Sequence, residues 1–152
     1  MKTKTFTSMM IATMIVASAN LFATVWRVNP TPNSSAHYTT LQAAHDNALT
    51  ISGDTLYLEG STYPSGGISL TKKLTIIGNG YFLAQNPETQ YNLQPSSISY
   101  YVYCYTGSEG SKFIGCTFQY SVYLYTNNIT FERNHFTYSN SNSIYTQANC
   151  SD

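Results

Sequence analysis

Charged residues are scarce in this chain of 152 residues, because Asp, Glu, Lys and Arg together make up only 9% of it and the formal net charge is zero. No basic patch is present, so the sequence predicts no nucleic-acid partner. No run of like charges indicates binding to a membrane surface. Tyr, Asn, Ser and Thr are abundant instead, which is typical of a β-rich exported protein with many turns.

Cysteine is sparse as well. Cys104, Cys116 and Cys150 are odd in number, and their spacing is not that of a disulfide framework. We interpret them as small buried hydrophobic residues, while secretion would permit disulfides, so their disulfide state stays open. No CxxC motif and no Cys/His pair at zinc spacing occurs, and we predict no metal site.

Long hydrophobic runs are missing, and the apolar stretch Met9–Val16 is too short and too interrupted for a membrane span. It follows Lys2 and Lys4 and precedes the small residues Ala17–Ala19, which is the order of a secretory signal peptide. We therefore predict a signal peptide over residues 1–23, with an uncleaved anchor as the alternative. The mature protein is expected to be secreted or on the cell surface, without a transmembrane segment.

Residues 24–152 are predicted to form one domain. Residues 24–53 are predicted to hold a short strand and a capping helix, and residues 54–152 hold the coils described below. In this second part, short apolar or aromatic runs alternate with Gly, Asn, Ser and Thr. Residues from about 83 to 97 lack apolar periodicity and are predicted to be an inserted loop.

Several short segments of the second part repeat. IIGNGY, FIGCTF and FERNHF superpose without gaps, which aligns Ile76 with Phe113 and Phe131, and Tyr81 with Phe118 and Phe136. YVYCYT is repeated as SVYLYT and, in shorter form, as SIYT. A spacing of about 18 to 22 residues with two or three short strands per unit predicts a β-solenoid, in which successive coils enclose an apolar interior.

A solenoid places equivalent residues at the same corner of each coil. The alignment brings Asn79, Cys116 and Asn134 to one such corner. Asn side chains at stacked positions hydrogen-bond to one another, and Cys116 is a small substitute for Asn. We therefore predict a structural corner ladder of these three residues.

Tyrosines recur on one face of the predicted strands. Strict alternation places Tyr103 and Tyr105 beside Tyr123 and Tyr125, and Tyr145 continues the row. Exposed aromatic faces suit stacking on sugar rings, which makes these residues candidate ligand contacts. Cross-coil aromatic pairs that stabilise the sheet are the alternative interpretation.

A complete catalytic set is not visible in the sequence. Glycoside hydrolysis needs a carboxylate pair, and a calcium-dependent lyase needs several clustered carboxylates with a base. Glu132, Arg133 and His135 are the best candidates for catalytic groups, because they are neighbours on a surface expected to face outward. A solvated polar edge explains this cluster equally well.

The run LQAAHDNA…SGDTLYLEGSTY…LTKKLTIIGNGYF resembles the N-terminal cap and first coils of right-handed parallel β-helix proteins of the pectin-lyase-like superfamily. In that pattern a capping helix precedes a Gly-Asp-Thr turn, a strand, a turn from Gly to Tyr, and a Lys-Leu-strand-Gly segment. The corresponding residues are Gly53–Thr55, Leu56–Leu58, Gly60–Tyr63 and Lys73–Gly78. The resemblance covers about Thr24 to Phe136.

The resemblance implies an all-β, right-handed parallel β-helix (β-solenoid) with a short N-terminal capping helix. It implies no single function, because the superfamily includes lyases, hydrolases, epimerases, adhesins and binding proteins. Ca²⁺ enters only through this resemblance, and the residues themselves suggest no cofactor. No C-terminal capping pattern is visible, so we expect a solenoid that is incomplete at its C-terminus.

The leading hypothesis is a secreted, surface-associated β-helix module that binds or presents toward polysaccharide or a cell-surface glycan. The first alternative is an N-terminal fragment of a polysaccharide lyase or glycoside hydrolase that lacks its catalytic coils. The second alternative is a structural, adhesin-type stalk without a small ligand. The sequence leaves the glycan and the oligomeric state open.

Overall fold

The computed structural model describes residues 23–85, 87–89, 91–138 and 142–147. Nearly all of the predicted signal peptide lies outside these residues, so the structure does not test it. In the part of the chain that is described, no helix has the length and apolar character needed to cross a membrane.

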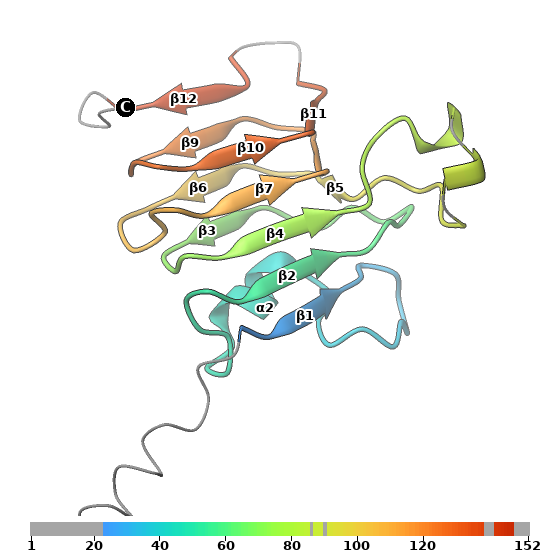
Figure 1. Ribbon diagram of the computed structural model, residues 1–152, viewed down its shortest axis with the longest axis horizontal. Helices are drawn as coiled ribbons and strands as arrows, with labels where there is room; N and C mark the ends of the chain where they lie inside the picture. The colour runs from blue at the N-terminus through green and yellow to red at the C-terminus, as the bar shows by residue number, and fades with distance from the viewer. Residues whose placement is uncertain (1–22, 86, 90, 139–141, 148–152) are drawn as a thin grey trace, which may run out of the picture.

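Three parallel sheets carry most of the regular structure (Figure 1). Sheet 1 consists, in order, of β1 (Val25–Val28), β2 (Thr55–Leu58), β4 (Thr75–Gly78), β7 (Lys112–Ile114) and β10 (Thr130–Glu132). Sheet 2 consists of β5 (Ser97–Ile98), β8 (Thr117–Phe118) and β11 (His135–Phe136). Sheet 3 consists of β3 (Ile68–Leu70), β6 (Val102–Cys104), β9 (Val122–Leu124) and β12 (Ile144–Thr146). Every strand pairs parallel to its neighbour.

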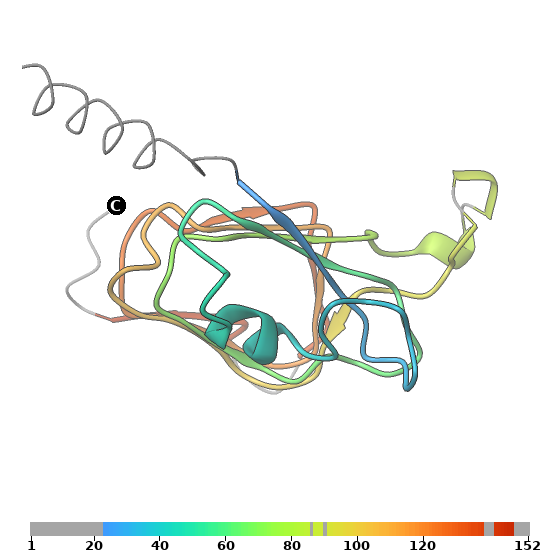
Figure 2. The same cartoon turned by 90° about the horizontal axis from the view of Figure 1, so that it is seen from below.

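The chain passes through the three sheets in a fixed order, and we call each passage a coil. β4, β5 and β6 form one coil, β7, β8 and β9 form the next, and β10, β11 and β12 form the one after that. Figure 1 shows the coils stacked from β1 to β12, and Figure 2, which looks along the stack, shows that they surround a common interior. The described chain is thus mainly β with parallel sheets, an architecture compatible with the predicted β-solenoid.

The strand register explains which residues form the core. β7 pairs with both β4 and β10, which confirms the predicted alignment of Ile76, Phe113 and Phe131. The rings of Phe113 and Phe131 stack with centroids 5.3 Å apart and an interplanar angle of 6°. Those of Phe118 and Phe136 stack at 4.8 Å and 9°. Equivalent positions of successive coils therefore build aromatic ladders inside the molecule.

The predicted alignment of Tyr81 with Phe118 and Phe136 is wrong at its first member. Ile98 of β5, and not Tyr81, pairs with Phe118 and is fully buried. The chain leaves the coil after β4 and re-enters it at β5, so Ile98, beyond the inserted segment, takes the core position.

A short helix lies at the β1 end of the core (Figure 1). It is α2 (Leu41–Asp46), and the Thr40 side chain caps it by accepting a hydrogen bond of 3.1 Å from the backbone N–H of Ala43. Leu41 and Ala44 are fully buried in the hydrophobic core. The helix thus contributes its apolar side to the first coils.

Asp54 ties the N-terminal strand to the coils. Its carboxylate accepts hydrogen bonds from the backbone N–H of Thr24 at 2.8 Å, the indole Nε1 of Trp26 at 2.9 Å and the backbone N–H of Ile51 at 3.0 Å. Burial by itself would raise the pKa of Asp54, but these hydrogen bonds outweigh it, and the pKa lies below its ordinary value. The charged form is therefore the one that the fold stabilises.

We predict that Asp54 makes the fold sensitive to acid. Because its pKa is lower in the folded chain, its contribution is present above the ordinary value of 3.8 and is lost as the pH falls through the lower folded pKa. Asp54→Asn should lower the free energy of unfolding at neutral pH by about 1–3 kcal/mol and should flatten its decline in acid. Urea unfolding across this pH range measures both effects. Glu88→Gln, an exposed change, is the control, and equal acid sensitivity of wild type and Asp54→Asn would contradict the prediction.

The phenylalanine ladder yields a second prediction. Phe113 is fully buried, so Phe113→Ala leaves a cavity between neighbouring coils and should lower the free energy of unfolding by about 3–5 kcal/mol. Tyr63→Ala, at a ring that is 53% exposed, should change it by less than about 0.5 kcal/mol. Denaturant titration compares the two, and a similar small loss in both variants would argue against the ladder.

Candidate functional site

The segment between β4 and β5 projects from the stack of coils (Figures 1 and 2). We call residues 79–96 the insertion; it contains the short 3₁₀ helices η1 (Leu83–Gln85) and η2 (Pro87–Thr89). Leu83 is 8% exposed, whereas Tyr91 is fully exposed. The insertion is thus anchored at its base and surrounded by solvent farther out.

The base of the insertion covers the outer face of sheet 2. Ser97 and Thr117 pair with each other and alternate with core residues, so their side chains point away from the core. They are nevertheless only 8% and 5% exposed. Leu93 and Pro95 of the insertion line a hollow together with both of them, which accounts for this burial.

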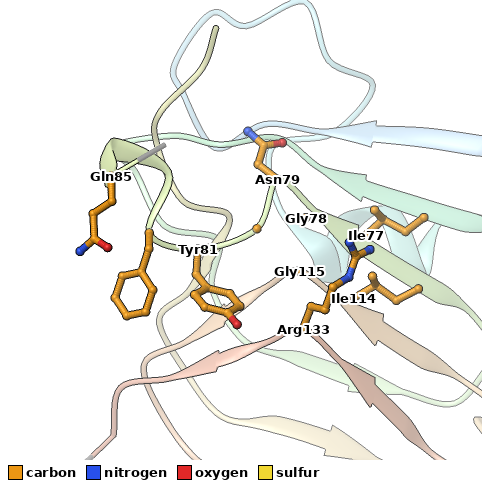
Figure 3. A pocket seen from close by; sticks show the side chains of 10 residues that line it. Ile77, Gly78, Asn79, Tyr81, Gln85, Ile114, Gly115 and Arg133 are labelled. Atoms are coloured by element: carbon orange, nitrogen blue, oxygen red, sulfur yellow. The ribbon is translucent and has the colours of Figure 1, made fainter. Parts of the chain in front are cut away.

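Two hollows lie where the insertion meets the coils, and we call them together the insertion groove. The corner hollow, of about 420 Å³, lies beside the turns that follow β4, β7 and β10 (Figure 3). The sheet hollow, of about 350 Å³, lies over the outer face of sheet 2. Tyr81, Phe82 and Gln85 line both, so the two hollows meet at these residues.

Two of the three predicted catalytic candidates line this groove, each in a different hollow. Arg133 lines the corner hollow and His135 lines the sheet hollow, whereas Glu132 lines neither. Glu132 Oε1 and Arg133 Nε form an exposed ion pair at 3.6 Å. The His135 ring instead packs on Tyr81 and Phe82, with centroids 5.6 and 4.9 Å apart. Among the described residues no acidic side chain lines either hollow, so the carboxylate pair of a glycosidase is not assembled there.

The described residues also do not fit the calcium ion that the family resemblance implies for lyases. Ca²⁺ takes about six to eight oxygen ligands, several of them from carboxylates. In this part of the chain, no three His, Cys, Asp or Glu side chains gather closely enough to hold a metal ion.

Two members of the predicted corner ladder lie next to each other. Asn134 Oδ1 accepts a hydrogen bond from the backbone N–H of Cys116, and Asn134 Nδ2 donates one to the carbonyl of Phe113, each at 2.8 Å. The Asn134 side chain therefore links its coil to the preceding one through the backbone, and the contact is structural.

Asn79 lies outside this arrangement. Its side-chain oxygen accepts a hydrogen bond of 2.9 Å from the hydroxyl of Tyr57, and its backbone N–H donates to Ser96 Oγ at 2.8 Å. Ser96 is fully buried and donates in turn to the carbonyl of Leu58 at 2.7 Å. Ser96 precedes β5 as Cys116 precedes β8, so in this coil the last residue of the insertion takes the corner position. Matching SSIS at 96–99 with CTFQ at 116–119 would have revealed it.

The predicted tyrosine row lies on the outer side of sheet 3. Tyr103 pairs with Tyr123, which pairs with Tyr145. Their rings stack with centroids 5.3 and 4.9 Å apart. Tyr105 and Tyr125 form a parallel stack at 5.1 Å. Successive coils thus place these rings one above another.

A further row of tyrosines, which the sequence repeats had not revealed, lies beside it. Tyr100, Tyr120 and Tyr138 each lie two residues after a core residue of sheet 2, and this constant offset is the signal that was overlooked. The rings of Tyr120 and Tyr138 stack at 5.5 Å, and Tyr101 contacts both Tyr120 and Tyr123. We call all tyrosines that follow Tyr91 the tyrosine face: Tyr100, Tyr101, Tyr103, Tyr105, Tyr120, Tyr123, Tyr125, Tyr138 and Tyr145.

The stacking decides what the tyrosine face presents. A ring inside a stack has its flat faces against its neighbours, so its edge and its hydroxyl are what remain for a ligand. Burial raises the pKa of Tyr101 and Tyr103, so their hydroxyls stay protonated at neutral pH and can donate hydrogen bonds. Sugar stacking on flat faces, as expected from the sequence, is blocked for the rings inside a stack and stays a prediction for the rings at its ends.

Comparison with protein-family models, with curated proteins and with solved structures finds no match for this chain.

The cysteines yield a prediction for thiol chemistry. Cys104 and Cys116 are buried free thiols, and burial raises the pKa of each to about 12, whereas Cys150 lies outside the described residues. At about pH 8 only about one in ten thousand of the buried thiols is ionised, so a folded Cys150→Ser variant should not react with Ellman's reagent. It should react fully after unfolding in guanidinium. Rapid reaction of the folded variant would contradict the burial of these thiols.

Proposed function

We propose that this chain is a secreted, right-handed parallel β-helix module of the pectin-lyase-like superfamily whose tyrosine face binds polysaccharide. Support for this fold comes from the parallel sheets, the fixed order in which the chain visits them and the helix at the N-terminal end of the core. The resemblance of the sequence to that superfamily, from Gly53–Thr55 to Lys73–Gly78, supports the fold as well.

The observation that carries the binding proposal is the stack of Tyr103, Tyr123 and Tyr145. Its rings follow one another at 5.3 and 4.9 Å, so hydroxyl-bearing ring edges repeat along the stack at the spacing of the coils. Beside them, Tyr105 and Tyr125 are 38% and 36% exposed. Such a surface is amphipathic, with apolar ring edges and polar hydroxyls.

A repeating surface suits an extended ligand. Each hydroxyl offers one modest hydrogen bond, and a polymer that lies along the stack makes many of them at once. A polysaccharide has this character, because hydroxyl groups recur along its length. A small ligand would contact one or two rings and gain little, so we propose a polymer as the partner of the tyrosine face.

The structural stalk remains the second candidate function. The observation that favours it is that the tyrosine rings use their flat faces on one another, which stabilises the sheet without any ligand. For a lyase or hydrolase, the described residues offer no corresponding observation.

Replacing tyrosine hydroxyls separates these two functions. The double variant Tyr103→Phe, Tyr123→Phe keeps both stacked rings and removes only the hydroxyls, so its denaturation midpoint should stay close to that of the wild type. If the tyrosine face binds polysaccharide, its affinity for the polymer should fall at least about tenfold, or about 1.4 kcal/mol. Retardation of the mature chain in gels cast with a panel of soluble polysaccharides measures this loss.

Tyr63→Phe is the matched control, because Tyr63 is exposed and lies outside the tyrosine face. It should bind like the wild type. Absence of retardation in every gel, or unchanged retardation of the double variant, would count against binding by the tyrosine face and leave the stalk.

A further inference from the structure

We propose that the tyrosine face is a site of oxidative cross-linking, in which Tyr105 and Tyr125 become joined by a carbon–carbon bond between their rings. The oxidant is a peroxidase that uses hydrogen peroxide as its electron acceptor. The bond ties one coil covalently to the next. This reactivity does not depend on polysaccharide binding by the same face.

The pair is positioned by the backbone of sheet 3. Tyr105 follows β6 and Tyr125 follows β9, and the last residues of these strands, Cys104 and Leu124, are register partners. The backbone N–H of Tyr125 donates a hydrogen bond of 2.8 Å to the carbonyl of Cys104. The two tyrosine rings lie with centroids 5.1 Å apart and an interplanar angle of 15°. Strand pairing therefore keeps the two rings side by side in the folded chain.

Exposure distinguishes this pair from the other tyrosines of the face. Tyr105 and Tyr125 are both exposed, and among the described residues no other pair of contacting tyrosines has two exposed members. Tyr103, in contrast, is half-buried among neighbouring tyrosine rings. Exposed side chains change rotamer rapidly, so these two rings can turn until the carbons beside their hydroxyls meet. The packed rings lack that freedom.

The coupling is balanced by the reduction of one peroxide. Each tyrosine gives one electron to the peroxidase and its phenolic proton to water, which leaves a phenoxyl radical. The two radicals form a bond between ring carbons adjacent to their oxygens, and the hydrogen on each of these carbons then moves to the oxygen and restores the phenol. Two tyrosines and one hydrogen peroxide thus give one dityrosine and two molecules of water.

The neighbouring rings deliver oxidation to this pair. The ring centroid of Tyr101 lies 5.0 Å from that of Tyr100 and 6.2 Å from that of Tyr103. Tyr103 in turn lies 6.0 Å from Tyr105. A phenoxyl radical takes an electron and a proton from an adjacent phenol, so the radical moves from ring to ring along this series. Radicals that form at other exposed rings of the face therefore reach the pair that is able to couple.

The chain offers few competing targets for the oxidant. Methionine and the cysteine thiolate are readily oxidised, but all four methionines lie within residues 1–23, so the predicted mature chain has none. Burial raises the pKa of Cys104 and Cys116 to about 12, so these thiols neither meet the oxidant nor form the reactive thiolate at neutral pH. Trp26, the single tryptophan, lies on sheet 1. In the described chain, tyrosine is therefore the main accessible target.

Peroxidase treatment of the mature chain tests the site. A haem peroxidase and one equivalent of hydrogen peroxide are added to a dilute solution of the Cys150→Ser variant, which lacks the cysteine outside the described residues. We expect dityrosine fluorescence in the monomer band of a denaturing gel. Trypsin cleaves after Lys112, between the two tyrosines, so mass spectrometry should find two tryptic peptides joined at Tyr105 and Tyr125. Cross-links that form only between chains, or only at other tyrosines, would overturn the proposal.

Variants that keep the ring and remove the hydroxyl assign the site. Tyr105→Phe cannot form the phenoxyl radical at this position, so it should lose most of the dityrosine in the monomer band. Tyr63→Phe and Tyr91→Phe are the matched controls, because both tyrosines are exposed and lie outside the tyrosine face. They should keep the cross-link. Undiminished dityrosine in the Tyr105→Phe monomer, or its loss in either control, would contradict the assignment.

The cross-link should also stabilise the stack of coils. It joins residues that lie 20 positions apart, and closing such a loop lowers the entropy of the unfolded chain. The thermal midpoint of the treated chain should therefore rise by about 5–10 °C, whereas that of treated Tyr105→Phe should stay unchanged. An unchanged midpoint in chains that carry the link would count against a bond between adjacent coils.

The double variant Tyr103→Phe, Tyr123→Phe tests the transfer of radicals apart from the pair. It retains Tyr105 and Tyr125, so the bond should still form, but with a lower yield per peroxide, because two rings that pass the radical on are removed. Complete loss of the bond would contradict the assignment to this pair, and an undiminished yield would contradict the transfer. No polysaccharide is present in these reactions, so a cross-linked chain that is not retarded in polymer gels would refute only the proposed function.

Discussion

The rest of the structure depends on parallel backbone pairing, in fixed register, between each coil and the next. The strands are only two to four residues long, so none can stand alone, and each is held by its neighbours in the stack. A shift by a single residue would turn every core side chain outward. The stacking of Phe113 on Phe131 inside and of Tyr103 on Tyr123 outside therefore follows from the same register.

The two candidate surfaces use this register in different ways. On sheet 3 it is continuous, and repetition of tyrosine produces a flat, regular surface. Between sheets 1 and 2 one coil is interrupted, and the segment that leaves it covers the strand face beside it. The first surface suits a ligand with its own repeat, whereas the second is hollowed. Asp54 and the helix α2 stabilise the β1 end of the stack, which precedes both candidate surfaces in the chain.

The sequence predicts what depends on local periodicity. Gapless repeats and strand alternation were sufficient to align Ile76 with Phe113 and Phe131 and to group Tyr103 with Tyr123. The same alignment failed for Tyr81, because a gapless match runs straight on where the chain leaves the coil, and the residues equivalent to Cys116 and Phe118 lie beyond the insertion. Ser96 and Ile98 were missed for that reason.

The groove could not be predicted, because it arises from contact between segments that are distant in the chain. Thr117 looks like an ordinary exposed strand residue until the insertion is seen to cover it. Glu132, Arg133 and His135 are neighbours in sequence, but the left-handed corner at Arg133 and the following strand direct them to different surroundings. Adjacency in sequence was therefore a poor guide to a shared site.

The position of the insertion also bears on how such a protein diversifies. Its two ends are β4 and β5, each already held by pairing to the coil above through β7 and β8. The entropy cost of closing a loop between fixed ends rises only by about 0.6 kcal/mol for each doubling of its length. Segments of different length and composition can therefore be exchanged at this corner while the coils keep their register, which makes the corner a variable recognition element on a constant framework.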